Sequence, residues 1–323
     1  MASAVTDWKS RIGRRVTLRD LYTLSAVVRW GSMAKAASHL SMSQSAVSES
    51  IAHLEEAVRV RLLDRTPQGI KPTVYAEALL KREHAVFDEL LQGIKDIEFL
   101  ADPTKGEVNI ACPDFISAGL LPAAIDRFLA RSENYIVQVL QLNLASFEFR
   151  ELRDRKVDLA LARVPTTFAD EELNVEVLFD DPHYIVAGLA SPWAKRRRID
   201  LAELVNAPWV LPNAKVFEEG LFRAFKLQGL EAPSIAVSAT SLPLRNQLLA
   251  TGRFLSVQAI SVLHRNAKEW SLKALPVNVS LSPPPVAVIT LRNRTIRPVV
   301  QLFIEELRAV VKTIPGTEKA RKT

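Results

Sequence analysis

The sequence predicts a multidomain fold: an all-α N-terminal segment, one long connecting helix, and a C-terminal α/β region of two lobes. Three observations predict this. Apolar residues recur at helical spacing through most of the first 100 residues, and a break containing Pro103 and Gly106 follows. Beyond the break, short strand-like segments alternate with amphipathic ones. A chain of 323 residues is long enough for two or three domains.

The composition is that of a soluble globular protein, with 48% hydrophobic and 24% charged residues. The N-terminus lacks the apolar core of a signal peptide, and no apolar run approaches the ~18 residues that a membrane span needs. The single cysteine, Cys112, excludes an internal disulfide, and we interpret it as a small buried hydrophobe rather than a redox sensor. We therefore expect a cytoplasmic protein.

Positive charge is concentrated at the N-terminal end. Residues 1–72 contain 11 Lys and Arg against 6 Asp and Glu, so they hold +5 of the net charge of +6. A basic module on a nearly neutral body indicates a polyanionic partner, although basic chain ends are often merely solvated.

Three short helices are predicted before residue 60. The first has apolar residues at 18, 21, 24 and 27, and Gly31 follows it as a typical helix stop. Ser32 can cap a second helix, residues 33–40, and Ser43 can cap a third.

The third helix has two different faces. Val47, Ile51 and Leu54 recur at spacings of 4 and 3 and continue to Val58, which predicts a buried face. The opposite arc carries small or hydrogen-bonding residues: Gln44, Ser45, Ser48, Glu49 and Ala52. Short side chains let a helix lie deep in a groove. Two short helices joined by a tight turn, the second with such a face, are typical of a helix-turn-helix.

The next segment, LLDRTPQGIKPT, predicts a β-ribbon wing. Pro67 and Gly69 break any helix, and Arg65 and Lys71 flank the break. Basic side chains at these positions suit phosphate contacts.

A long helix is predicted from Thr73 to about Leu100. Its apolar residues alternate by three and four, which indicates a heptad pattern, interrupted at Glu83. We interpret the pattern as a dimer seam, with a helix packed on its own domain as the alternative. The seam residues are Leu80, Phe87, Leu90, Ile94 and Ile97.

The remaining residues predict strands alternating with helices, hence a mostly parallel sheet covered by helices. About 210 residues exceed one such sheet, so we expect two lobes with a ligand cleft between them. The first lobe would span about 106–165 and 265–315, and the second about 166–264.

Several of these segments together resemble the LysR-type transcriptional regulators. The GSMAKAA run, SQSAVS, the IxxLE at Ile51–Glu55 and the LLDR–G–PT wing fall in that family's order and spacing. Three positions depart from the family pattern: Arg59 stands where Gly is usual in a turn, Tyr75-Ala76 replaces Ala-Gly, and Glu49 stands where Arg is common.

The resemblance implies a winged helix-turn-helix at residues 16–73, a linker and dimerisation helix at 74–100, and an effector-binding domain of two Rossmann-like lobes at 106–315. It also implies a homotetramer, a dimer of dimers, on a dyad-symmetric promoter site. RNA polymerase is then a candidate further partner, and no membrane is involved.

The resemblance further implies that the third helix faces the major groove of DNA. Gln44 can pair with adenine, and Ser45 and Ser48 can serve bases or phosphates. Ser43 can cap its helix and present N–H groups to a phosphate. The full set of expected DNA-binding residues is Ser32, Ser43, Gln44, Ser45, Ser48, Glu49, His53, Arg65, Lys71 and Thr73.

Glu49 has three interpretations. Its carboxylate can accept from cytosine N4, can pair with His53 one turn on, or can simply weaken DNA binding. An unpaired carboxylate near phosphates is unfavourable, which favours the first two.

The expected effector site lies between the lobes. Arg163 is a candidate for a carboxylate, with a surface salt bridge as the alternative, and Asp114 is expected to cap a helix. If Asp114 faces the cleft instead, it disfavours a purely anionic effector. An effector that is a carboxylate or an aromatic compound fits the candidate residues, which are Pro113, Asp114, Phe115, Asn143, Ser146, Arg163, Thr240, Ser241 and Phe254.

Two other classes of protein fit the sequence less well. The five histidines show no metal-ligand spacing, and GxSxG, P-loop and dinucleotide motifs are absent, so no catalytic residue, metal or cofactor is expected. A standalone solute-binding protein would match the two lobes. The basic helical N-terminus and the lack of a signal peptide argue against it.

Overall fold

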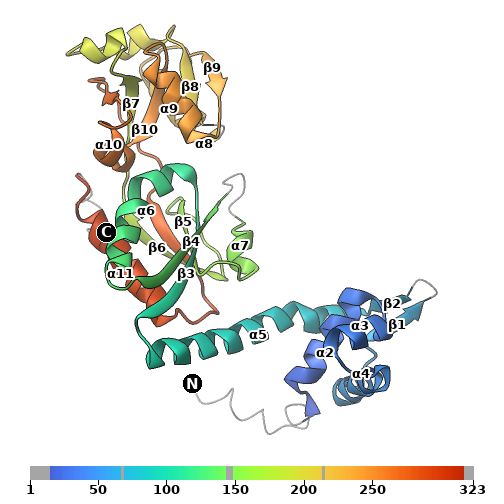
Figure 1. Cartoon of the computed structure of the whole chain (residues 1–323). Coiled ribbons are helices and arrows are strands. Elements are labelled where there is room, and N and C mark those ends of the chain that lie inside the picture. Colours follow the sequence, from blue (N-terminus) through green and yellow to red (C-terminus); the bar gives the residue numbers. More distant parts are fainter. Residues whose placement is uncertain (1–14, 67–68, 143–147, 213–214, 316–323) are drawn as a thin grey trace. The chain divides into compact units, whose positions relative to one another are not determined.

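The computed structural model of the chain describes residues 15–66, 69–142, 148–212 and 215–315 (Figure 1). The chain forms two compact units, residues 1–91 and 92–323. The helix α5 (Val74–Ala101) runs from the first unit into the second. Within the described residues, no helix combines the length and the apolar character needed to cross a membrane.

The first unit is a small helical domain with a two-stranded ribbon. The predicted helices and wing are present: α2 (Leu18–Trp30), α3 (Met33–Leu40), α4 (Gln44–Val58), β1 (Leu63–Thr66) and β2 (Gly69–Pro72). Leu24, Val27, Val47 and Leu54 are fully buried in its core, as the spacing of apolar residues predicted. The expected winged helix-turn-helix fold is confirmed.

Close contact with the turn between α2 and α3 fixes the wing. Gly31 ends α2 in the left-handed region, at φ 64°. The Ile70 N–H donates to the Gly31 carbonyl at 3.0 Å. A Cβ on Gly69 would lie 2.9 Å from that same oxygen, so only glycine permits this approach.

Arg59, where the resemblance leads us to expect Gly, takes the left-handed conformation. It lies at φ 60° and ψ 28°, and its N–H donates to the Glu55 carbonyl at the end of α4. An arginine here is strained by contact between its Cβ and the backbone, since this region costs roughly 1 kcal/mol for residues other than glycine.

The second unit contains two five-stranded sheets. The first lobe has the strand order β4-β3-β5-β12-β6, and the second lobe has the order β11-β7-β10-β8-β9. The strands of the first lobe are β3 (Lys105–Cys112), β4 (Asn134–Gln141), β5 (Leu159–Arg163), β6 (Leu173–Phe179) and β12 (Val286–Leu291). Those of the second lobe are β7 (His183–Gly188), β8 (Trp209–Leu211), β9 (Ile235–Ser238), β10 (Leu255–Ala259) and β11 (Leu272–Ala274).

Each sheet has one reversed strand. In the first lobe β12 runs antiparallel to both of its neighbours, β5 and β6, and in the second lobe β7 does the same between β10 and β11. The chain enters the second lobe through β7 and returns to the first lobe through β12. Both strands therefore start at the boundary between the lobes, where the other strands of their sheets end. As predicted, most strands of each sheet run in the same direction. Because the reversed strand lies between two others, half of the neighbouring pairs are nevertheless antiparallel.

The predicted limits of the lobes are wrong at both crossings. β6 belongs to the first lobe and β11 to the second, so the chain crosses at about 180–182 and again between 275 and 285. The sequence did not predict β6 because its middle residues are exposed at a sheet edge. Its partner β12 lies more than 100 residues away in sequence, so no local pattern reports the pairing.

Helices cover the faces of both sheets. In the first lobe, α6 (Asp114–Leu129) and α11 (Pro298–Val311) bury Phe128 and Phe303 against one face, and α7 (Arg150–Arg153) covers the other face with Leu152. In the second lobe, α8 (Lys215–Leu227) and α9 (Leu242–Ala250) pack on opposite faces. The shorter helices are η2 (Pro192–Lys195), η3 (Leu201–Leu204) and α10 (Ile260–Asn266).

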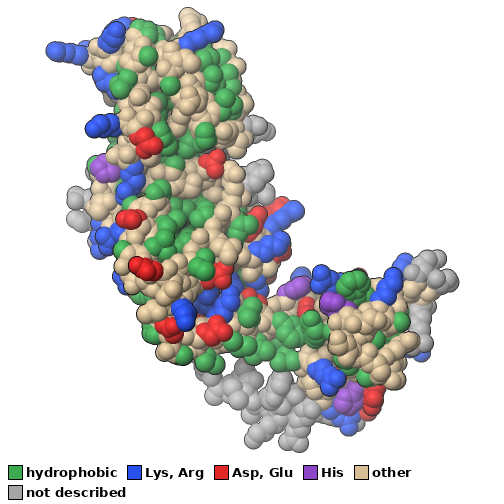
Figure 2. Space-filling view, in the orientation of Figure 1, with side chains coloured by type: hydrophobic (Ala, Val, Ile, Leu, Met, Phe, Trp, Pro, Cys, Tyr) green, Lys and Arg blue, Asp and Glu red, His purple; other side chains and the backbone are tan. Residues whose placement is uncertain are grey.

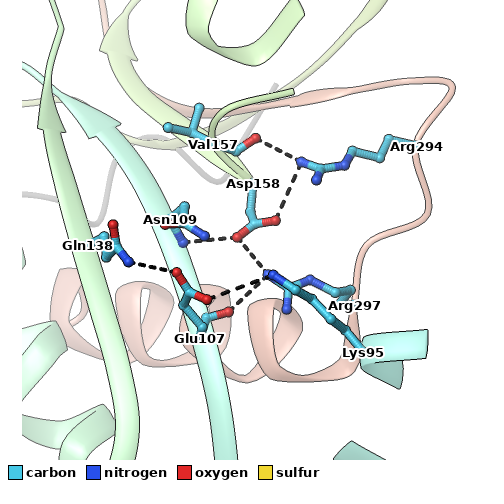
Figure 3. Close-up of polar contacts among 8 residues, drawn as sticks. All are labelled: Lys95, Glu107, Asn109, Gln138, Val157, Asp158, Arg294 and Arg297. Carbon is cyan, nitrogen blue, oxygen red and sulfur yellow. Dashed lines mark hydrogen bonds and ion pairs between the residues drawn. The ribbon is translucent and has the colours of Figure 1, made fainter. Parts of the chain in front are cut away.

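A buried polar cluster joins the start of the first lobe to the end of α5 (Figure 3). The Asp158 carboxylate accepts from the Asn109 N–H at 2.9 Å and from Arg297 at 2.8 Å. Arg297 also donates to the Glu107 carbonyl, and the Glu107 carboxylate lies 3.7 Å from Lys95 of α5. These contacts, together with Phe99 against the first-lobe core, anchor the last turns of α5.

Replacing the strained Arg59 should stabilise the first unit. Arg59→Gly should raise the free energy of unfolding by about 0.5–1 kcal/mol, because relief of strain exceeds the added chain entropy. Urea denaturation measures the difference. Arg61→Gly, at a neighbouring exposed arginine without positive φ, should instead destabilise. An equal effect of the two changes would contradict strain at Arg59.

Candidate DNA interface and inter-lobe site

The start of α4 is fixed by its cap. The Ser43 hydroxyl accepts from the Ala46 N–H at 3.1 Å and forms a 2.9 Å hydrogen bond with the Ser45 hydroxyl. Val47 and Ile51 face the core, while Gln44, Ser45, Glu49 and His53 are exposed. Ser48 is half-buried. The structure thus brings the predicted groove-facing side chains together on one exposed face.

A buried carboxylate braces α4 against α2. Asp20 accepts from the Ser50 hydroxyl at 2.6 Å and from the Thr17 hydroxyl at 2.7 Å. Asp20 is only 6% exposed, so these bonds are shielded from competing water. They fix the angle between the two helices. No sequence pattern predicted this brace, because residues 20 and 50 belong to different elements.

Glu55 of the IxxLE motif positions the wing. One carboxylate oxygen accepts from the backbone N–H groups of Leu62 and Leu63, at 2.7 and 3.2 Å. The motif therefore has a structural reason: it holds the first residues of the ribbon against the end of α4.

The other predicted DNA contacts differ in their environment. Lys71 is exposed on β2, and the backbone of Arg65 pairs with Ile70, while its side chain lies outside the described residues. The Thr73 hydroxyl donates to the Arg61 carbonyl and accepts from the Ala76 N–H, so it caps α5. Ser32 stands at the N-cap of α3 without a side-chain cap bond.

The exposed carboxylate of Glu49 forms no hydrogen bond or ion pair within the described part of the chain. Pairing with His53, one of the three interpretations of Glu49, is therefore not formed. By contrast, Glu56 pairs with Arg15 at 3.0 Å. Glu49 thus remains available to a group outside the chain.

The heptad pattern of α5 divides into two parts. Leu80 packs on the core of the first unit, and the ring of Phe87 lies edge-on to Tyr22 at 5.7 Å. Further along, Leu90, Ile94 and Ile97 are 49%, 47% and 67% exposed. Figure 2 shows hydrophobic side chains along this helix. The alternative of packing on its own domain therefore applies to Leu80 and Phe87, and the rest of the seam is uncovered in one chain.

A buried ion pair lies where the chain crosses between the lobes. Arg163 donates to the Asp181 carboxylate at 2.6 Å and to the Pro284 carbonyl at 3.1 Å. Asp181 also accepts from the N–H and hydroxyl of Ser261 at the start of α10. Burial lowers the pKa of Arg163, and Asp181 acts in the opposite direction.

This pair corrects the interpretation of Arg163. The side chain is 5% exposed and already bound to a carboxylate, so it does not offer itself to an effector. The alternative of a salt bridge is right, but the bridge is buried rather than on the surface. Nearby, burial and then Arg163 hold the pKa of His183 well below its ordinary value, so this histidine is neutral at neutral pH.

The remaining inter-lobe candidates lie in three places. Pro113, not Asp114, occupies the N-cap of α6, and the Asp114 carboxylate accepts from Gln141 at 2.8 Å. Ser241 caps α9 and Thr240 precedes it, at the boundary end of β9. Phe115 has Arg163 over its ring at 5.5 Å. Asn143 and Ser146 lie outside the described residues.

Phe254 is misplaced among these candidates. It lies just before β10. The last residue of β10, Ala259, pairs with His183 at the boundary, whereas the first, Leu255, pairs with Ala187 at the far end of β7. Phe254 therefore lies at the end of the sheet away from the lobe boundary. There it packs on an apolar cluster under Arg253. Two residues nearer the boundary, Arg245 and Gln258, were missed, because one polar residue in a helix or strand gives no local signal.

Comparison with known proteins identifies the family. The model described as the LysR substrate binding domain matches residues 101–312, and the model of the bacterial regulatory helix-turn-helix protein, lysR family, matches residues 18–77. The chain belongs to the LysR family. Its expected domain types, a helix-turn-helix followed by a substrate-binding domain, are confirmed.

Transcriptional regulators of bacteria match most of the chain. The transcriptional dual regulator GltC of Bacillus subtilis is 29% identical over 81% of this chain and 86% of its own length. The uncharacterized regulator YdcI of Escherichia coli is 23% identical over 93% and 97%.

Solved structures share the LysR fold. A full-length OxyR variant from Pseudomonas aeruginosa aligns with TM-score 0.59 at 18% identity, over 95% of this chain and 99% of its own. Full-length CbnR complexed with its target DNA aligns with TM-score 0.52 at 20% identity, over 92% and 100%.

Removing the acid of the buried pair should destabilise the second unit. Asp181→Asn leaves the Arg163 charge uncompensated and should lower the free energy of unfolding by about 3–5 kcal/mol. Urea unfolding followed by tryptophan fluorescence measures the loss. Asp180→Asn, at the exposed neighbouring acid, is the control. In the double variant Arg163→Met/Asp181→Asn the loss should be clearly smaller, and additive losses would contradict the pairing.

Proposed function

We propose that this LysR-family regulator binds a dyad-symmetric DNA site as a pair of chains, with α4 of each chain in a major groove. One observation carries the proposal: α4 is capped and buried on one side and presents a free face of short polar side chains on the other. Such a face fits base edges without holding the helix away from the groove. The target DNA in the CbnR complex supports the same general use.

Within α4, the proposed division of work follows from chemistry. Gln44 is suited to adenine, and Ser45 and Ser48 can bond to bases or phosphates. Ser43 and the first N–H groups of the helix suit a phosphate, and His53 lies one turn beyond Glu49 on the exposed side. Lys71, and Arg65 from its position in sequence, would hold the phosphate backbone beside the wing, with Ser32 and Thr73 near them.

Pairing is proposed to occur through α5. An uncovered row of Leu90, Ile94 and Ile97 at heptad spacing fits a second copy of the same helix. Pairing in this way would set the distance between the two copies of α4 and so the half-site spacing. A dimer of dimers and contact with RNA polymerase complete the proposal.

The second unit is proposed to sense a small molecule between its lobes. Strands from both lobes end at one boundary, which in α/β proteins is where ligands bind. A ligand there would shift the association of the lobes and hence the DNA geometry. No catalytic role is proposed, and a regulator of promoters works in the cytoplasm, where bacterial DNA lies.

An electrophoretic mobility shift with the full chain tests the proposal. Genomic fragments upstream of its own gene and its neighbours, titrated against salt, should give a specific shift in the nanomolar range and a steep salt dependence. A chain starting at residue 101 should give none. Absence of any shift with the full chain at low salt contradicts the proposal.

Glu49 should control both affinity and sequence preference. Glu49→Arg replaces a negative by a positive charge near phosphates, so the slope of log affinity against log salt should steepen by roughly 1. Glu49→Gln should relax the preference for one base pair by about 1–3 kcal/mol. Salt titration and selection from random DNA measure the two effects. Glu231→Arg, at an exposed acid of the second lobe, should change neither.

Charges on the exposed part of α5 should separate the chains. Ile94→Glu/Ile97→Glu should raise the dimer dissociation constant at least roughly a hundredfold, because apolar burial of both residues on both chains is lost. Analytical ultracentrifugation measures it. Leu227→Glu, at an apolar residue that is 80% exposed in the second lobe, is the control. An unchanged oligomer in the double variant would place the interface elsewhere.

A further inference from the structure

The carboxyl ends of strands from both lobes meet at one boundary. β5 ends at Arg163, which is bonded to Asp181 between the lobes. β10 ends at Ala259 opposite His183, and β8 and β9 run parallel to it, so their ends lie at the same edge. This edge is where an α/β fold presents loops and helix N-termini to a ligand.

Three arginines are buried in the described part of the chain, and they differ in charge compensation. Arg163 pairs with Asp181 at 2.6 Å, and Arg297 pairs with Asp158 at 2.8 Å. Arg245 has the smallest exposed fraction, 2%, and forms no ion pair with a carboxylate among the described residues. A buried charge without a directly bonded counter-ion is unfavourable, so Arg245 is a candidate to bind an anionic group from outside the chain.

The guanidinium of Arg245 is held at the boundary edge of the second lobe. One terminal nitrogen donates to the carbonyls of Ala239 and Thr240, both at 2.7 Å, in the loop that follows β9. Its Nε is buried and has no hydrogen-bond partner among the described residues. The head group is therefore fixed in place. The Nε atoms of Arg163 and Arg297 are likewise unbonded, so Arg245 differs from them in lacking an ion pair with a described carboxylate.

Neighbouring groups add an acid and neutral polar atoms. Asn246, next to Arg245, accepts from Gln258 of β10 at 3.3 Å. Burial lowers the pKa of Arg245 to about 10, and the Asp114 carboxylate of the first lobe acts in the opposite direction. Asp114 opens α6 directly after β3, which runs parallel to β5 and ends at the same boundary edge. Its hydrogen bond is to Gln141, not to Arg245.

We propose that the effector is a small zwitterion of the amino-acid type, with its carboxylate on Arg245 and its ammonium group on Asp114. This rests on the proposed effector response of the second unit. A simple anion would bind Arg245 but be repelled by Asp114. A simple cation would bind Asp114 but be repelled by Arg245. A zwitterion compensates both charges without adding net charge to a poorly hydrated site.

The test is a binding screen on the full chain by thermal shift and calorimetry. The probes are the twenty proteinogenic L-amino acids, each with its matched acid lacking the amino group and its matched amine lacking the carboxyl group. One such set is L-phenylalanine, 3-phenylpropionate and phenethylamine. At least one amino acid should raise Tm, while its matched acid and amine should bind at least roughly tenfold more weakly.

Variants assign the two charges. Arg245→Gln should weaken binding of that amino acid roughly a hundredfold, and Asp114→Asn should remove the preference over its matched acid. Arg253→Gln, at an exposed arginine of the second lobe, should leave binding unchanged. Far-UV circular dichroism of each variant confirms that the chain is folded.

Three outcomes overturn the inference: no amino acid shifts Tm, the matched acid binds as tightly, or a folded Arg245→Gln chain binds as the parent does. These outcomes differ from failure of the proposed function. If the proposed function fails, the full chain gives no mobility shift with DNA, even when it binds an amino acid.

Discussion

The ion pair between Arg163 and Asp181 is the constraint on which the second unit depends. Asp181 lies in the first crossing between the lobes, and Pro284, whose carbonyl Arg163 also bonds, lies in the second. Ser261 adds the start of α10 to the same carboxylate. One buried pair therefore fastens both crossings between the lobes. Loss of either partner would leave the other charge buried and uncompensated.

The same electrostatic logic separates structural from ligand-binding charges. Arg297 and Asp158 compensate each other at the edge of the first lobe, where Arg297 begins α11 and the nearby Glu107 meets the end of α5. Arg163 is equally compensated. Arg245 has no such carboxylate among the described residues, although its guanidinium is held by two carbonyls. Among the described residues, the two arginines that join separate elements thus each have a directly bonded carboxylate, and Arg245 has none.

Much of the first unit was predictable because its contacts are local. The 4 and 3 spacing of Val47, Ile51 and Leu54 selects one buried face on one helix, and Ser43 caps that helix within three residues. Its polar face was likewise predicted as a set. Of the three interpretations of Glu49, pairing with His53 is not formed, since helical spacing permits a contact but does not require side chains to make it.

The sequence by itself determined the family, the capped recognition-type helix, the ribbon and the long helix, because motif order and periodicity are properties of neighbouring residues. Only the tertiary structure decided that β6 belongs to the first lobe and that Arg163 is already bound to Asp181. It also decided that Phe254 lies away from the boundary, and that Arg245 is buried without an ion pair among the described residues. Each of these depends on residues far apart in the chain, such as Asp181 with Ser261 or β6 with β12, and charge compensation between such residues leaves no periodic trace in the sequence.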